Sequence, residues 1–159
     1  MKTDRRLSKV VILSLLSAAF IAVCPAQAQS VVSTFTLPVS GTISAAKSGL
    51  NETVTLSGSV LVTARVVNDP ALGPGAVVSI DGRGVKGIGN KTQTVYLNEC
   101  EAKLTRPFAA TDVIKLTFAF FQDAPGSYLR SKTGLLTLTL TYDTVTMKLT
   151  NVTGSAGAL

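Results

Sequence analysis

Hydrophobic and polar residues alternate along most of the chain, and the longest alternating segment covers residues 53–67. Its even positions from Val54 to Val66 are mostly apolar, whereas Thr and Ser occupy most of its odd positions. Successive side chains of a strand point to opposite faces, so this pattern predicts a β-strand with one buried and one solvated face. A strand of this length can bend near Gly58 and serve two sheets.

Other segments alternate in the same way. The clearest are residues 112–121, 134–142 and 145–152, and the weaker ones are residues 31–37, 76–81 and 92–105. The sequence predicts a tight hairpin turn at Asp143-Thr144, between two of the clear strands. The segment 92–105 changes phase, because Leu97 is odd-numbered and Cys100 is even-numbered. Either a bulge near Asn98 or two separate short strands would explain this change.

Turn residues separate these segments, and no segment of ten or more residues after the N-terminal region has a clear helical period. Asn, Asp, Pro and Gly cluster at residues 68–70, 73–75 and 124–126. The pattern predicts an all-β fold, an antiparallel β-sandwich of about seven or eight strands, with a small closed barrel as the alternative. We expect one domain over residues 29–159, with a loose C-terminal tail from about residue 153.

The N-terminal region has the three parts of an export signal. A basic segment is followed by the fourteen apolar residues 10–23 and by a small-x-small cleavage site at Ala26 and Ala28. We predict a helical signal peptide over residues 1–28, cleaved so that Gln29 begins the mature chain. Fourteen helical residues span about 21 Å, less than the roughly 30 Å of a bilayer core, so we expect no transmembrane anchor after cleavage.

Cys24 offers an alternative to cleavage after Ala28. The residues before it resemble a bacterial lipobox, except that Val23 stands where a small residue is expected. Lipidation at Cys24 therefore stays open beside simple cleavage. Both alternatives predict export, either to the periplasm or to the cell surface or medium.

Charge and composition exclude several classes of function. The chain has 159 residues, a net charge of +6 and no His. Without residues 1–28 it keeps 11 basic and 8 acidic residues, a net charge of +3, and the basic residues are scattered singly. Nucleic-acid binding needs a clustered basic surface, so we expect no nucleic-acid partner. The absence of His excludes His-dependent catalytic triads and His-ligated metal sites, and no motif implies a cofactor.

Cys100 would be the one cysteine of the mature chain. It alternates with charged neighbours, so we expect it to point inward as a free, inert thiol. An intermolecular disulfide is the functional alternative. Glu99 and Glu101 place two carboxylates on one side of the same strand, but Lys103 shares that face, so the set is typical of a charged exterior rather than of a catalytic or calcium-binding pair.

Residues 82–87 match the pattern G-x-G-x-x-G after a plausible strand. A dinucleotide site needs a helix after the glycines, whose N-terminus holds the pyrophosphate. The residues that follow, from Thr92 to Leu97, have the character of a strand. The pattern therefore predicts a flexible hairpin loop and no nucleotide site.

A resemblance adds to this interpretation. Residues 84–89, Tyr96, and residues 106–112 leading into the strand at Phe118 and Phe120 together resemble small uncharacterised exported bacterial β proteins. The resemblance covers roughly residues 60–150, and its motifs are not specific. It implies export and a β fold, and it implies no activity.

These observations favour a non-enzymatic binding or structural module of the cell envelope or surface, which acts through a protein partner or as a homo-oligomer. Exposed strand edges can recruit an added strand. The alternative is a periplasmic carrier of a lipid or another apolar ligand, with the strands closed around a cavity. An enzyme is the least favoured hypothesis, because no residues form a catalytic constellation.

Overall fold

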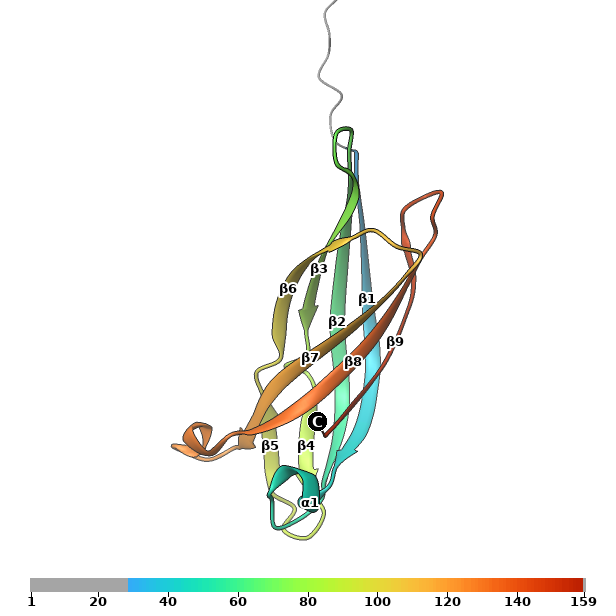
Figure 1. Ribbon diagram of the computed structural model, residues 1–159. Coiled ribbons are helices and arrows are strands. Elements are labelled where there is room, and N and C mark those ends of the chain that lie inside the picture. The colour runs from blue at the N-terminus through green and yellow to red at the C-terminus, as the bar shows by residue number, and fades with distance from the viewer. Residues whose placement is uncertain (1–28, 159) are drawn as a thin grey trace, which may run out of the picture.

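The computed structural model describes residues 29–158, and strands make up most of them (Figure 1). The strands are β1 (Gln29–Ile43), β2 (Val54–Asp69), β3 (Gly73–Asp81), β4 (Lys86–Gly89), β5 (Val95–Asn98), β6 (Glu101–Pro107), β7 (Thr111–Gln122), β8 (Lys132–Tyr142) and β9 (Leu149–Ala158). A short helix α1 (Ala45–Ser48) follows β1, and a 3₁₀ turn η1 (Ser127–Arg130) follows β7. The all-β prediction is confirmed, with nine strands rather than seven or eight.

The residues expected to direct export lie outside this range. Cys24, Ala26 and Ala28 are not among the described residues, so lipidation and cleavage stay predictions. Gln29, the expected first residue of the mature chain, begins β1.

β2 is the strand around which the others are arranged. One of its edges pairs with β1 over all but its last residue, from Val54 opposite Ile43 to Asn68 opposite Gln29. Its other edge is shared, because residues 54–57 pair with β4 and residues 61–69 pair with β3. The long alternating segment is therefore one strand that serves two different neighbours, as its length suggested.

The pairing order makes a closed circuit with an extension. β1, β9, β8, β7, β5, β4 and β2 follow one another, and the β1–β2 pairing returns to the start. β3 and β6 lie outside this circuit and extend it from β2. Figure 1 shows β7, β8 and β9 running obliquely across the β1–β2 pair. The sheet is mixed rather than purely antiparallel, because β1 and β9 pair in parallel at Gly41–Ala156 and Thr42–Gly157.

Gly58 marks the point where β2 changes neighbours. Its φ of +148° lies in a region that residues with a side chain rarely adopt. A Cβ atom here would also collide with the Gly84 carbonyl oxygen and with Val85 Cα. The loop between β3 and β4 therefore crosses β2 at van der Waals contact, and this crossing requires glycine.

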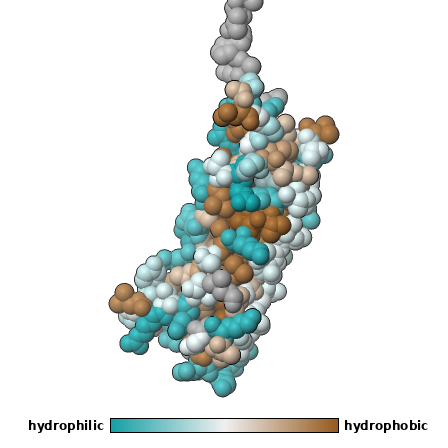
Figure 2. All heavy atoms as spheres, in the orientation of Figure 1, coloured by the Kyte–Doolittle hydropathy of each residue, from teal (hydrophilic) through white to brown (hydrophobic). Residues whose placement is uncertain are grey.

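The core contains the inward side chains of the circuit and of β3. Its largest fully buried members are Phe120, Ile43, Ile80, Leu136, Leu138, Leu140 and several valines of β2 and β3. Each such side chain contributes about 1.5–3 kcal/mol by leaving water. Figure 2 shows hydrophobic side chains projecting at the chain's loops, and the most exposed are Leu72, Leu129 and Val145. They are isolated from one another, so they carry no functional argument.

The segment 92–105 forms two strands, which decides between the two alternatives left open by its phase change. β5 ends at Asn98 and β6 begins at Glu101. The Asn98 amide donates to the carbonyl oxygens of Gly82 and Val85, and its side-chain oxygen accepts from Cys100 N–H at 2.8 Å. This buried amide satisfies the backbone groups that the break in the ladder leaves unpaired.

β4 was not predicted, and a buried carboxylate holds it in place. Glu52 accepts hydrogen bonds from the backbone N–H groups of Lys91 and Thr92 at 2.8 and 2.9 Å and from the Thr92 hydroxyl at 2.5 Å. These bonds, led by the Thr92 hydroxyl, lower the pKa of Glu52 below its usual value. Glu52 thus fixes the loop between β4 and β5 by contacts distant in sequence.

Two predictions at the C-terminal end are wrong. Residues 153–158 are not a loose tail, because they pair with residues 134–139 of β8. The close packing around β9 favours small side chains, because a Cβ atom at Gly154 would approach the side chains of Leu138 and Leu37 too closely. The turn after β8 is also longer than Asp143-Thr144: the Asp143 carboxylate accepts from Val145 and Thr146 N–H, so residues 143–148 form the loop.

The crossing at Gly58 makes a stability prediction. Gly58→Ala combines an unfavourable φ with a backbone collision, so we expect it to lower the free energy of unfolding by about 2–3 kcal/mol or more. Gly73→Ala has a positive φ but open space around it, and we expect a loss of about 1–2 kcal/mol. Gly75→Ala is the control, expected within about 0.5 kcal/mol of the original. Urea denaturation measures all three, and equal effects at Gly58 and Gly73 would contradict a close crossing.

Candidate functional site

The β3–β6 extension ends in a strand with an open edge. β6 pairs with β3 from Glu101 opposite Asp81 to Pro107 opposite Gly75. No other strand within residues 29–158 pairs with the second edge of β6. Figure 1 shows β6 at the side of the molecule, connected to β7 by an arch at its upper end.

Alternate residues of β6 direct their backbone groups toward this open edge. Gly82 N–H donates to the Cys100 carbonyl oxygen at 2.7 Å, and Phe108 N–H donates to the Pro74 carbonyl oxygen at 3.2 Å. The even-numbered residues therefore face β3, and the odd-numbered ones face away. Within residues 29–158, no strand pairs with the N–H and C=O groups that Lys103 and Thr105 direct to this edge. Pro107 has the same orientation, which suits a residue without an N–H.

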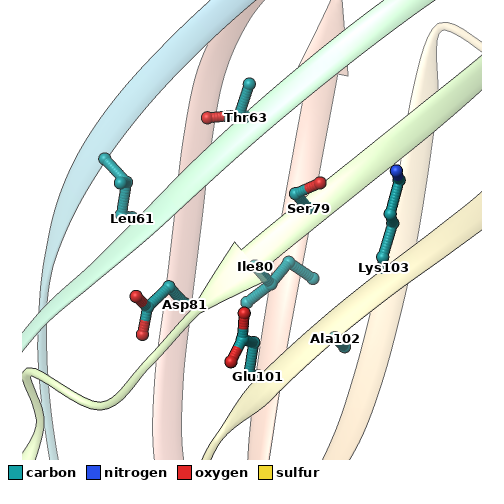
Figure 3. Close-up of a pocket in the computed structure, with 8 residues that line it drawn as sticks. All are labelled: Leu61, Thr63, Ser79, Ile80, Asp81, Glu101, Ala102 and Lys103. Carbon is teal, nitrogen blue, oxygen red and sulfur yellow. The ribbon is translucent and has the colours of Figure 1, made fainter.

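The outer face beside this edge has a shallow hollow of about 370 Å³. Six side chains form two rows across β2, β3 and β6: Leu61, Asp81 and Glu101 in one, Thr63, Ser79 and Lys103 in the other. Figure 3 shows the two rows, with Ile80 and Ala102 between them. The short Ser79 side chain stands among longer ones, which leaves the hollow above it.

An arginine from the next loop connects the carboxylates of the first row. Arg83 donates to Asp81 through Nε at 2.9 Å and Nη2 at 2.6 Å, and its Nη1 lies 3.5 Å from the Glu101 carboxylate. The Arg83 side chain lowers the pKa of Asp81 to about 2, chiefly through these hydrogen bonds. Asp81 is therefore ionised at neutral pH. Arg83 lies closer to Asp81 than to Glu101, so the contact between Arg83 and Glu101 is the weaker of the two.

Asn98 fixes the loop that carries Arg83. Its bonds to the Gly82 and Val85 carbonyl oxygens hold both ends of the loop. The loop leads into β4 and not into a helix. Residues 82–85 form a turn, in which Val85 N–H donates to the Gly82 carbonyl oxygen, but the predicted hairpin loop is wrong. β3 and β4 both pair antiparallel with β2, so they run in the same direction and the loop does not reverse the chain.

Cys100 lies beneath this loop and is buried, as its alternation with charged neighbours predicted. Burial, and then the charge of Asp81, raises the pKa of the thiol to about 11. A neutral thiol is a poor nucleophile, so Cys100 acts as a small core side chain.

Glu99 and Glu101 are both exposed, as expected for a charged exterior, but their backbone groups lie beside different strands. Glu101 lies at the open edge beside Lys103, but Glu99 N–H donates to the Ala119 carbonyl oxygen of β7 at 3.2 Å. Ser79, Leu61 and Arg83 complete the site, and the alternation of residues along the sequence does not identify them. The spacing Asp81-Gly82-Arg83 was a local sign of the ion pair, whereas the contributions of β2 and β3 depend on strand pairing.

A second, larger groove of about 880 Å³ lies between residues 121–132 and Leu50 and Tyr96. Most of its lining comes from the exposed connection between β7 and β8, and the rest includes Tyr96 and Gln122, which pair between β5 and β7. Among residues 29–158, no group of three or more Cys, Asp or Glu side chains could hold a metal ion. No helix in the same range is long and apolar enough to cross a bilayer.

Comparison with known proteins adds no assignment. No protein-family model matches the chain, and no curated protein or solved structure matches it either. The function must therefore be inferred from the geometry of the site itself.

The Asp81–Arg83 pair makes a prediction about acid titration. The pKa of Asp81 in the folded protein, about 2, lies below its ordinary value of 3.8, so this pair stabilises the fold above about pH 3.8 and the contribution disappears as the pH falls through about 2. Arg83→Ala should raise the pKa toward 3.8 and lower stability much more at pH 7 than at pH 2, where the Asp81 carboxyl is already partly protonated. Carboxyl NMR titration measures the pKa, and an unchanged value in Arg83→Ala would contradict the pairing; Lys115→Ala, a lysine on β7, is the control.

Proposed function

We propose that this chain is an exported, non-enzymatic binding module of the β-sandwich or small-barrel class. Its site is the open edge of β6, where it binds an extended polypeptide segment as an added strand. The envelope or cell surface is the proposed location. The observation that carries the proposal is the unpaired row of backbone groups at Lys103 and Thr105 beside a hollowed polar face.

Strand addition suits this edge for energetic reasons. Backbone N–H and C=O groups on a strand edge form a ready-made template, and an added strand satisfies them with regular hydrogen bonds. β3 supports β6 along its whole length, and the inner residues Val78 and Ile80 are fully buried. The template is therefore held by the core, and binding needs little ordering of this side of the interface.

The charged groups of the site support binding rather than catalysis. Paired carboxylates that hydrolyse glycosides need one acid with a raised pKa. The pKa of Asp81 is lowered instead, because Arg83 holds the ionised form. The chain has no His to act as a base or nucleophile partner. These features favour a binding role for Asp81 and Glu101.

The carrier of an apolar ligand is less well supported. Such a carrier needs an internal cavity, and typical ligand pockets have volumes of about 300–1,000 Å³. The space between the core and the Asn98 loop, lined by Val85, Cys100 and Phe118 among others, is about 10 Å³. That volume holds at most a single water molecule. The two larger hollows are not internal: one lies on the outer face beside β6, and the other is lined mainly by the exposed connection between β7 and β8, together with Leu50 and Tyr96.

A peptide selection tests strand addition. A random nine-residue peptide library is selected on the purified protein, and the winners are measured against Lys103→Pro and Lys103→Ala. Both variants lose the ammonium group, but only the proline variant loses the outward N–H at the edge. We expect Lys103→Pro to weaken binding at least about tenfold relative to Lys103→Ala, because an edge hydrogen bond is lost and an acceptor on the peptide is left unpaired.

The native Pro107 shows that β6 accepts proline at an outward-facing position. Thermal unfolding of both variants confirms that they fold, and Thr105→Pro gives a second test at the same edge. Equal binding by the proline and alanine variants, or a selection that yields no edge-dependent peptide, would refute the proposed function.

A further inference from the structure

The side chains at the β6 edge also specify which strand can be added. Residues opposite one another on neighbouring strands have Cβ atoms about 4.5–5.5 Å apart and point to the same face. Partner residues opposite Glu101 and Lys103 would therefore lie on the outer face, two positions apart. Opposite charges in such pairs stabilise the sheet, and like charges destabilise it.

We propose that the added strand carries a basic side chain opposite Glu101 and an acidic side chain opposite Lys103. This inference rests on strand addition at β6 and names the sequence class that the edge accepts. Both charges can pair with a partner strand. Lys103 has no ion pair among the described residues, and Arg83 lies closer to the Asp81 carboxylate than to the Glu101 carboxylate. The Glu101 side chain is 67% exposed, so a partner can reach it.

The alternate positions of the added strand face inward. Side chains at these positions would lie beside Ala102 and Leu104 of β6, which are half-buried. Leu104 packs against the core. An apolar side chain beside Leu104 would cover the apolar surface that the edge leaves exposed. The accepted segment is therefore amphipathic, with a charged outer face in acid–x–base or base–x–acid order and an apolar inner face.

β7 sets the lower limit of the binding edge. Glu99 N–H already donates to the Ala119 carbonyl oxygen, so β7 occupies the place opposite Glu99. The added strand must end or turn away opposite Glu101. A second copy of β6, placed so that Glu101 and Lys103 pair reciprocally, would put its Thr105 opposite Glu99 and collide with β7. The partner is thus a different segment rather than this strand of a second copy.

A charge-swapped variant tests this specificity with the same nine-residue library. The double variant Glu101→Lys with Lys103→Glu keeps the backbone edge and the net charge but exchanges the two signs. Peptides selected on the original protein should contain an acidic and a basic residue two positions apart, and they should bind the swapped variant about tenfold more weakly. Selection on the swapped variant should give the reverse order of charges relative to the edge.

The controls separate the possible failures. Lys115→Glu, an exposed charge change on β7, should leave binding unchanged. The preference should shrink in about 1 M salt, which screens exposed charges beyond about 3 Å. Peptides that depend on the Lys103 N–H but bind both charge forms equally would overturn this inference and leave strand addition intact. Selected peptides that are insensitive to Lys103→Pro would overturn strand addition itself.

Discussion

The sharing of one edge of β2 between two partners determines the rest of the architecture. β2 offers residues 54–57 to β4 and residues 61–69 to β3, and the β3–β4 loop crosses between them over Gly58. The β4 side leads through β5, β7, β8 and β9 back to β1 and closes the circuit. The β3 side leads to β6 and stops. The open edge of β6 therefore depends on this division of β2 together with the divergence of β7 from β6 beyond Glu99.

The chain protects this open edge in part and leaves the remainder available. Charged side chains and proline reduce unwanted pairing at strand edges, and β6 has Glu101, Lys103 and Pro107 on its outward positions. The same charges that discourage indiscriminate pairing can select a complementary strand. Asn98 and Arg83 contribute indirectly, because they hold the 82–85 loop and the Asp81 carboxylate in place beside the edge. Specificity and protection thus come from the same residues.

Local alternation was sufficient to predict the strands that have one buried face. β2, β7 and β8 follow their predicted segments closely, and the phase change at Asn98 correctly marked a break. The four-residue β4 escaped notice because Glu52, far away in sequence, stabilises its loop. The small residues of β9 resembled a tail, since glycine and alanine signal flexibility unless a crowded neighbour such as Leu138 requires them.

Only part of the candidate site could be predicted from the sequence. The sequence predicts that Glu101 and Lys103 share one charged face of a strand. Whether these side chains can contact a partner strand depends on which edge of β6 is unpaired. That edge is set by pairings between residues about 20 positions apart, such as Asp81 with Glu101, and by the divergence of β7 from β6 beyond Glu99. Ser79 and Leu61 entered the site through the same long-range pairings, which local periodicity does not contain.

Native-state amide hydrogen exchange along β6 tests the central claim most directly. In the free protein, the amides of Ala102 and Leu104 bond to β3 and should be protected, whereas those of Lys103 and Thr105 face the open edge and should exchange rapidly. Alternating protection, read residue by residue by NMR, would establish the edge as open. Equal protection of Lys103, Leu104 and Thr105 would show that another segment already covers it and would contradict the account.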